Sequence, residues 1–350
     1  MTDIAILGAG VMGAAMAMPA TTAGLTVALV GTPLDAAIVS ALQAGLPHPR
    51  LGVTMPAGVA VHQPADFAAV AHGGLRLIIL GVSSPGVNWA IDRLVEGLRE
   101  PIPVLMITKG LFPGDGRLDV LPSRVAQQVR ARTGLDLTVM AVGGPCIAGE
   151  LAALRDTSVV ITGQDAAVAA VLDMLRAPYY HARASQDLIG VEICAAFKNF
   201  YALAVGAVAG MAETCGEAPN GARMHNLSSS VFTQALSEMA ILIEVSGGVP
   251  ATAFSLAGAG DLHVTCVAGR NSRMGQLLGL GLPYSRAKAE HMAADTVEGA
   301  QLALDLGPTL GAMMAAGTLP PDRMPLTRGI LDTVCRDRPL ALDFSRYHRA

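Results

Sequence analysis

The feature that most limits the fold of this chain is a glycine-rich segment close to its first residue. The apolar run Ile4–Leu7 leads directly into Gly8-Ala9-Gly10-Val11-Met12-Gly13, and a helical pattern follows. In a strand–turn–helix unit, the first such glycine permits the tight turn, the second lets the backbone approach a pyrophosphate, and the third lets helix and strand pack closely. Helix-end N–H groups then face the phosphates. In this context the segment predicts a dinucleotide site, and a glycine turn without a ligand is the less favoured alternative.

The first half of the chain alternates short apolar runs with helical segments. The predicted strands are Ile4–Leu7, Val27–Val30, Leu77–Leu80, Val104–Ile107, Thr138–Val142 and Val159–Thr162. The predicted helices are Ala14–Ala23, Asp66–Ala71, Val87–Arg99, Ser123–Thr133 and Asp165–Leu175. Continuous apolar strands separated by helices are typical of a parallel sheet covered on both faces. We therefore predict an α/β fold, with an N-terminal Rossmann doubly wound parallel sheet over residues 1–185.

From about residue 186 the pattern changes to long helical segments, which predicts a mostly α-helical domain over residues 186–350. The predicted helices are Leu188–Met211, Leu227–Val245, Arg286–Asp305 and Leu326–Arg336. The first of these is very apolar but carries Glu192, Lys198 and Asn199. Because a charge at the centre of a bilayer costs about 2.5–3.5 kcal/mol, we expect a buried helix and no membrane partner.

Composition narrows the class of protein. A net charge of −4, with no basic stripe interleaved with aromatic residues, makes nucleic acid an unexpected partner. The 5 cysteines are scattered without C-x-x-C spacing, which argues against a disulfide framework and against a structural metal site. The first basic residue is Arg50, so the apolar start lacks the positive region of a signal peptide. We expect a cytoplasmic protein.

The end of the second predicted strand reads Val30-Gly31-Thr32-Pro33. An acidic residue there would bind the ribose 2′-hydroxyl of NAD, and a nearby arginine would bind the 2′-phosphate of NADP. The segment has neither at its tip, and Asp35 is displaced from that position. The sequence therefore leaves NAD and NADP open as cofactors.

Lysine is rare in this chain. Of the 24 basic residues only Lys109, Lys198 and Lys288 are lysines, which leaves 24 − 3 = 21 arginines. Lys198 lies in an apolar helical segment, where a lysine must reach solvent, pair with an acid or face a polar site. It is a catalytic candidate, and the alternative is a structural ion pair with Glu192 or Asp261.

The other two lysines have less unusual surroundings. Lys109 follows the predicted strand Val104–Ile107, at the carboxyl end where open α/β sheets bind ligands. The alternative for Lys109 is a solvent-facing loop position. Lys288 has the pattern of an ordinary exposed helix residue.

A polar cluster occurs in the second predicted domain. Asp261, Thr265, Arg270 and Asn271 lie within a short, glycine-rich stretch. Arginine beside asparagine suits a phosphate group, because a guanidinium binds two phosphate oxygens at once. The alternative is an aspartate helix cap followed by a solvated arginine loop. We interpret His263 as a structural histidine.

Taken in order, these motifs resemble the NAD(P)-dependent glycerol-3-phosphate dehydrogenase family over nearly the whole chain. The matching stretches are the glycine turn, Thr108-Lys109-Gly110, Gly144-Pro145-Cys146-Ile147-Ala148-Gly149-Glu150, Phe197-Lys198-Asn199, Ala257-Gly258-Ala259-Gly260-Asp261-Leu262, Thr265-Cys266, Arg270-Asn271 and Val297-Glu298-Gly299. The resemblance implies a Rossmann domain followed by a helical domain, a cleft active site, and a homodimer.

The resemblance also implies roles for individual residues. The implied catalytic residues are Lys198, Lys109, Asp261 and Thr265, with Lys198 as the main catalytic lysine. The implied substrate-binding residues are Lys109, Asn199, Arg270 and Asn271, the last two for the substrate phosphate. The implied cofactor-binding residues are Gly8, Gly10, Val11, Met12, Gly13, Ala148 and Glu298.

Some positions depart from the family pattern and leave the exact substrate open. Bacterial members usually carry Trp at the position of Met12, Ser at that of Cys146 and Arg at that of Ser272. The expected reaction is hydride transfer between NAD(P) and sn-glycerol 3-phosphate or dihydroxyacetone phosphate. The alternatives are another phosphorylated ketose or polyol, a non-phosphorylated polyol or hydroxy acid, and a non-catalytic dinucleotide-binding sensor.

Overall fold

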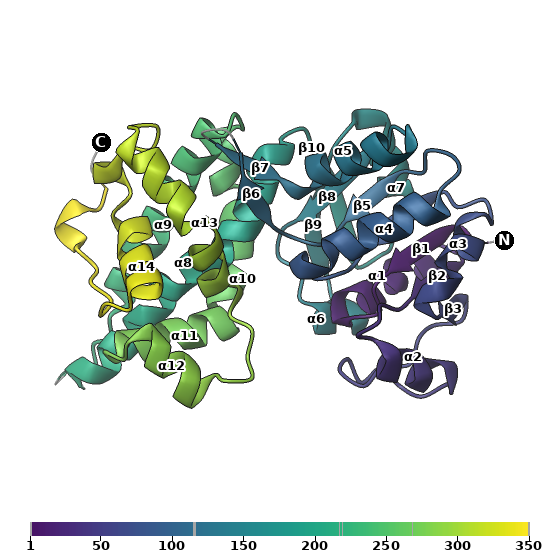
Figure 1. Ribbon diagram of the computed structural model, residues 1–350. Helices are drawn as coiled ribbons and strands as arrows, with labels where there is room; N and C mark the ends of the chain where they lie inside the picture. Colours follow the sequence, from purple (N-terminus) through teal and green to yellow (C-terminus); the bar gives the residue numbers. More distant parts are fainter. Residues whose placement is uncertain (1, 115–116, 217, 219, 268, 349–350) are drawn as a thin grey trace. The chain divides into compact units, whose positions relative to one another are not determined.

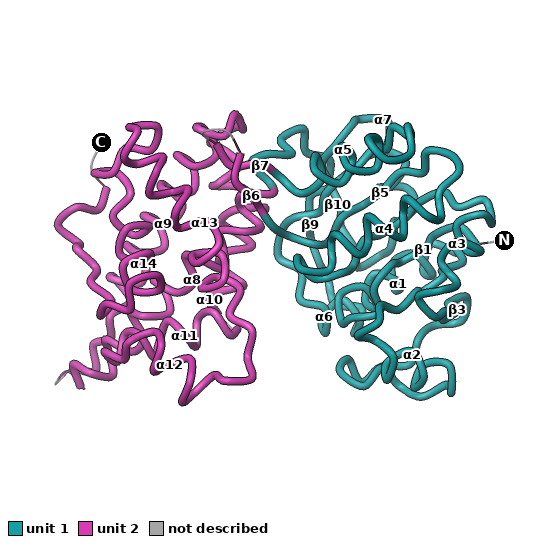
Figure 2. The backbone as a smooth tube through the Cα atoms, viewed as in Figure 1, with its two compact units in different colours: residues 1–110, 120–191 teal, residues 111–119, 192–350 magenta. Residues whose placement is uncertain are grey.

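The computed structural model describes residues 2–114, 117–216, 218, 220–267 and 269–348. The chain forms two compact units, shown in Figure 2. Unit 1 comprises Met1–Gly110 and Val120–Val191, and unit 2 comprises Leu111–Asp119 and Glu192–Ala350. The short segment 111–119 therefore belongs with the second unit, although it interrupts the first in sequence.

Unit 1 is built on an eight-stranded sheet with the strand order β10-β9-β8-β5-β4-β1-β2-β3. Its strands are β1 (Ile4–Leu7), β2 (Val27–Val30), β3 (Val59–His62), β4 (Leu77–Leu80), β5 (Val104–Met106), β8 (Val139–Gly143), β9 (Thr157–Thr162) and β10 (Tyr180–Ser185). Every neighbouring pair is parallel except β8 and β9. All residues of β1, β2 and β4 are buried, so both faces of the central strands are covered.

The helices of unit 1 cover this sheet (Figure 1). They are α1 (Val11–Thr22), α2 (Ala36–Gln43), α3 (Phe67–Ala71), α4 (Val87–Gly97), α5 (Leu121–Thr133), α6 (Ala148–Ala152) and α7 (Asp165–Met174). α1 packs against α6, and α4 packs against both α3 and α5. The predicted α/β class with a Rossmann-like sheet is confirmed.

Unit 1 differs from the prediction in its sheet and in two short helices, α2 and α6, which the sequence pattern did not predict. The sheet is mixed, because β9 runs antiparallel to β8. An apolar run predicts a buried strand but says nothing about its direction. The edge strands β3 and β10 were also missed, since β3 is only partly buried and β10 is mostly polar and half-exposed. Edge strands have solvent on one side, so they lack the continuous apolar run of a central strand.

Unit 2 is mostly helical, as predicted. Its elements are α8 (Leu188–Cys215), α9 (His225–Val245), α10 (Asp261–Val267), α11 (Arg270–Gly279), α12 (Tyr284–His291), α13 (Glu298–Ala315) and α14 (Pro325–Arg336), with a two-stranded sheet of β6 (Leu111–Pro113) and β7 (Leu118–Val120). By length and composition alone α8 would span a membrane, yet 78% of its most apolar window is buried inside the structure. It is a core helix.

The segment predicted as one helix, Arg286–Asp305, is instead two. α12 ends at His291 and α13 begins at Glu298. The Lys288 ammonium donates to the carbonyl oxygens of Met292 (2.7 Å) and Ala293 (3.0 Å), which satisfies acceptors just beyond the end of α12. The single-helix prediction was wrong because this break depends on contacts that the apolar pattern does not report.

Glycine contacts bring α8 and α11 close together. A Cβ atom added at Gly275 would lie 2.2 Å from the Leu203 carbonyl oxygen, and one at Gly279 would lie 1.9 Å from that of Ala207. Both distances are far below contact distance, so the helix backbones meet where these side chains are absent. This packing places the first residues of α11 beside the middle of α8.

Candidate active site

The glycine turn of unit 1 has the geometry that its sequence predicts. Gly8 has φ +117°, and a Cβ atom there would lie 2.6 Å from the Gly81 carbonyl oxygen. A Cβ atom on Gly13 would lie 2.1 Å from the Gly8 carbonyl oxygen, whereas one on Gly10 would meet no atom within 4 Å. The turn is therefore tight at its first glycine, closely packed at its third and open at its second. That arrangement fits a pyrophosphate beside Gly10 and the first residues of α1.

Asp35 and His48, neither of which was predicted as a site residue, hold this turn in place. Asp35 Oδ2 accepts hydrogen bonds from the backbone N–H of Ala9 (3.1 Å) and Thr32 (2.8 Å). His48 Nδ1 accepts from the backbone N–H of Arg50, so Nε2 carries the proton and donates to the Ala9 carbonyl oxygen at 3.0 Å. Asp35, next to the start of α2, carried a weak sequence signal, and His48 carried none.

Lys109 and Ala148 also belong to unit 1. The loop after β5 is held by Thr108, whose hydroxyl donates to the carbonyl oxygens of Leu80 (3.2 Å) and Val82 (2.7 Å). The Ser84 hydroxyl donates to the Lys109 carbonyl oxygen at 2.6 Å, which fixes the Lys109 backbone at the carboxyl end of the strand. Ala148 is the buried first residue of α6, which packs on α1.

In unit 2 the structure pairs Lys198 with Asp261. The Lys198 ammonium donates to Asp261 Oδ1; the Lys198 side chain is 12% exposed and that of Asp261 is fully buried. Asp261 begins α10 directly after one turn of π-helix, Leu256–Gly260, whose start is capped when Ser255 Oγ accepts from the Ala257 N–H. Such turns are frequent at functional sites, because they re-aim the residues that follow.

Thr265 lies one turn after Asp261 on α10. Its hydroxyl donates to the Asp261 carbonyl oxygen at 2.7 Å, so its oxygen lone pairs still have room to accept a hydrogen bond. The neighbouring Cys266 differs in character, because burial raises the pKa of its thiol to about 12. Cys266 is therefore a protonated thiol at neutral pH and a poor nucleophile.

The remaining predicted residues of unit 2 form a second polar group. Asn271 Nδ2 donates to Asn199 Oδ1 at 3.0 Å and to Glu298 Oε2 at 3.4 Å. Asn271 Oδ1 accepts from the Gly299 N–H at 2.8 Å, and Arg270 Nη2 donates to Glu298 Oε1. The polar group Asn199, Arg270, Asn271 and Glu298 thus joins the starts of α11 and α13 to α8.

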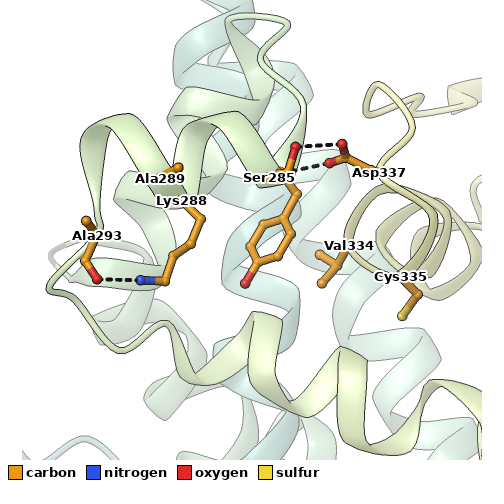
Figure 3. Close-up of a pocket in the computed structure, with 8 residues that line it drawn as sticks. Ser285, Lys288, Ala289, Ala293, Val334, Cys335 and Asp337 are labelled. Atoms are coloured by element: carbon orange, nitrogen blue, oxygen red, sulfur yellow. Dashed lines mark hydrogen bonds between the residues drawn. The ribbon is translucent and has the colours of Figure 1, made fainter.

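A surface pocket of about 440 Å³ also lies in unit 2 and is drawn in Figure 3. Residues from α12 and α14, and from the segments directly after these two helices, line it. Among them are Tyr284, Lys288 and Cys335. Asp337 closes one side, where its carboxylate accepts two hydrogen bonds from Ser285. None of the predicted catalytic or phosphate-binding residues lines this pocket. Lys288, which lines the pocket, donates hydrogen bonds to the backbone just beyond the end of α12. The pocket is therefore separate from the candidate active site described above.

Two family models match the chain almost end to end. The model described as the NAD-dependent glycerol-3-phosphate dehydrogenase N-terminus matches residues 3–169, and the corresponding C-terminus model matches residues 187–340. The chain is 34% identical over 302 residues to the NADP(+)-dependent glycerol-3-phosphate dehydrogenase of Archaeoglobus fulgidus, covering 85% of this chain and 86% of that protein. It is 31% identical over 292 residues to the glycerol-3-phosphate dehydrogenase [NAD(P)+] of Xanthomonas campestris, covering 82% and 80%.

Solved structures agree with this grouping. The glycerol-3-phosphate dehydrogenase of Coxiella burnetii superposes with a TM-score of 0.76 at 26% identity, covering 97% of this chain and 96% of that one. The enzyme of Saccharomyces cerevisiae, 18% identical, shares the fold with a TM-score of 0.79 and covers 97% of both chains. The resemblance inferred from the motifs is confirmed, with an NAD(P)-dependent dehydrogenase activity. This chain belongs to the NAD-dependent glycerol-3-phosphate dehydrogenase family.

Proposed function

We propose that this enzyme interconverts sn-glycerol 3-phosphate and dihydroxyacetone phosphate, with Lys198 as its main catalytic residue. The observation that carries the catalytic part is the pairing of Lys198 with a fully buried Asp261 in unit 2. The substrate is supported by the printed names of relatives above 30% identity. We also propose residues 1–185 as the cofactor domain and residues 186–350 as the substrate domain.

Reduction of a ketone places negative charge on the carbonyl oxygen and requires a proton there. The Lys198 ammonium meets both needs, because it is a compact cation and a proton donor. Asp261 acts as a positioning residue that holds the ammonium through Oδ1. The hydroxyl of Thr265, anchored to the same helix, contributes a further hydrogen bond to the substrate. NAD(P) supplies or accepts the hydride when it is bound.

The phosphate group of the substrate is assigned to Arg270 and Asn271. Arginine binds phosphate through two parallel hydrogen bonds, and an asparagine amide beside it adds a third donor. Asn199 belongs with this pair through its hydrogen bond to Asn271. We assign Lys109 a part in catalysis and substrate binding from the family resemblance and from its position at the carboxyl end of β5.

The cofactor, NAD or NADP, is assigned to Gly8, Gly10, Val11, Met12 and Gly13. The open position beside Gly10 supports this, since the backbone there is accessible to a phosphate. Ala148 and Glu298 are proposed as further cofactor contacts from the resemblance.

A direct test is to follow oxidation of NADH and of NADPH separately with dihydroxyacetone phosphate. Wild-type enzyme should oxidise at least one cofactor rapidly, and Lys198→Ala should lose about 10²–10⁴-fold in turnover while still binding cofactor. Lys288, which is partly buried and caps the end of α12, offers the matched control: Lys288→Ala should retain turnover. Equal turnover in Lys198→Ala would refute the catalytic assignment. No turnover of wild type, with cofactor binding intact, would redirect the search to other phosphorylated ketoses.

We also infer a cytoplasmic homodimer. The dimer is supported by family resemblance, and light scattering should give twice the chain mass of 35.8 kDa. A mass near 35.8 kDa would contradict it.

A further inference from the structure

In unit 2, one carboxylate engages both proposed phosphate-binding residues. Arg270 Nη2 donates to Glu298 Oε1, and Asn271 Nδ2 donates to Glu298 Oε2 at 3.4 Å. The two oxygens of Glu298 thus bind the guanidinium and the amide that stand side by side at the start of α11. Two oxygens of a phosphate group would make the same pair of contacts.

The hydrogen bonds of Asn271 are already committed. Besides the contact with Glu298, Nδ2 donates to Asn199 at 3.0 Å, and Oδ1 accepts from the Gly299 N–H at 2.8 Å. Because Gly299 requires an acceptor, the amide cannot turn over to present another face. Asn271 is only 4% exposed. A ligand that takes a hydrogen bond from Asn271 must therefore displace the Glu298 carboxylate.

The backbone of Glu298 is not free to move away. A Cβ atom on Gly299 would lie 2.1 Å from the Asn199 carbonyl oxygen, so the start of α13 rests directly on α8. The side chain has more freedom, since Arg270 and Glu298 are 46% and 41% exposed. Any exchange at this place is a rotation of the Glu298 side chain and needs no shift of the helix.

We propose that Glu298 is an internal competitor for the substrate phosphate, occupying Arg270 and Asn271 until the phosphate displaces it. This inference rests on the proposed function, because it takes Arg270 and Asn271 as the phosphate site. A carboxylate already in place opposes entry by like-charge repulsion and is itself replaced only by a stronger anion. A phosphate group replaces the carboxylate because it makes strong charge-assisted hydrogen bonds to the same guanidinium and amide.

The test measures anion binding without cofactor, so that any role of Glu298 in cofactor binding does not enter. Glycerol 3-phosphate and inorganic phosphate are titrated calorimetrically into wild type, Glu298→Gln, Glu298→Ala and Arg270→Ala. Glu298→Gln should bind both anions about 10-fold more tightly, because the competing charge is gone. Glu298→Ala should show at least the same gain, and adding Arg270→Ala to it should remove the gain. Glu290→Gln, in the exposed Arg286–Glu290 pair of α12, is the matched control and should bind as wild type does.

The outcomes separate this inference from the proposed function. If Arg270→Ala binds glycerol 3-phosphate as well as wild type does, the phosphate site itself is wrongly placed. If Arg270→Ala binds weakly while both Glu298 variants bind no more tightly than wild type, the phosphate site stands and the competitor role is overturned.

Discussion

The ammonium of Lys198 donates a hydrogen bond to Asp261, whose side chain is fully buried. Either charge alone would be unfavourable in the interior, because removing an ion from water costs several kcal/mol unless a partner compensates it. The pair links the middle of α8 to the first residue of α10. Catalytic geometry and stability are therefore coupled at this one contact.

This coupling predicts an asymmetry between single and double variants. Asp261→Ala should destabilise the enzyme by about 3–5 kcal/mol, because the Lys198 ammonium loses its buried carboxylate. Lys198→Ala/Asp261→Ala should be more stable than Asp261→Ala, since no charge is left behind. Urea unfolding of the single and double variants measures both. A double variant no more stable than Asp261→Ala would show that the pair makes no net electrostatic contribution.

The close packing of α8 on α11 predicts opposite effects for two glycine substitutions. Gly275→Ala should lower stability by about 1–3 kcal/mol or more, because its Cβ atom would lie 2.2 Å from the Leu203 carbonyl oxygen. Gly311→Ala, inside α13 with no atom within 4 Å of the new Cβ, should raise stability by about 0.5–1 kcal/mol. Thermal unfolding distinguishes the two. Equal effects would contradict the tight helix contact.

The hydrogen bonds of Asp35 to the glycine turn predict that an Asp35 variant loses affinity for the cofactor selectively. Asp35→Ala removes the carboxylate that accepts from the Ala9 N–H, so the turn should loosen and NAD(P)H should bind about 10-fold more weakly. Turnover at saturating cofactor should change little, because Asp35 makes no contact with the proposed catalytic residues in the described structure. Fluorescence titration with NADH and NADPH gives the affinities. Asp156→Asn, a surface carboxylate bonded to His181, is the control that should bind cofactor normally.

A buried carboxylate in unit 2 predicts a pH dependence of stability. Glu238 Oε2 accepts from the Thr327 N–H (2.8 Å) and hydroxyl (2.6 Å), and Oε1 accepts from Gln234 (3.0 Å). Burial nevertheless raises the pKa of Glu238 from its ordinary 4.5 to about 7. Between these values the folded chain holds a proton that the unfolded chain has released. The contribution of protonated Glu238 to the stability of the folded chain is therefore full below pH 4.5, and it is lost as the pH rises through 7.

The slope of this loss is at most about 1.4 kcal/mol per pH unit. Urea unfolding from pH 5 to pH 8 should show it in wild type, and Glu238→Gln should remove it, because the amide does not titrate. Glu290→Gln should keep the wild-type slope, since that residue is exposed. A Glu238→Gln variant with an unchanged slope would assign the pH dependence to another group.

Patterns close together in the chain were sufficient to predict the central strands of unit 1 and the start of α8. Neighbouring residues alone determine the strand–glycine–helix order at Gly8–Gly13 and the apolar runs of β1, β2 and β4. These features can therefore be predicted without knowledge of the tertiary structure. The motifs also restricted the partner of Lys198 to a short choice, Glu192 or Asp261. Segments whose form depends on distant contacts were missed or misread, such as the edge strands and the break between α12 and α13.

Only the tertiary structure decided which polar groups meet. Asp261 is 63 residues from Lys198, and Asn199 is 72 residues from Asn271. The glycine contacts of α8 with α11 and α13 close the second of these distances. The same holds for Asp35 and His48 at Ala9, and for the direction of β9. Local sequence sets the backbone preference of each segment, whereas the pairing of segments depends on burial and hydrogen bonds that exist only once the chain has packed.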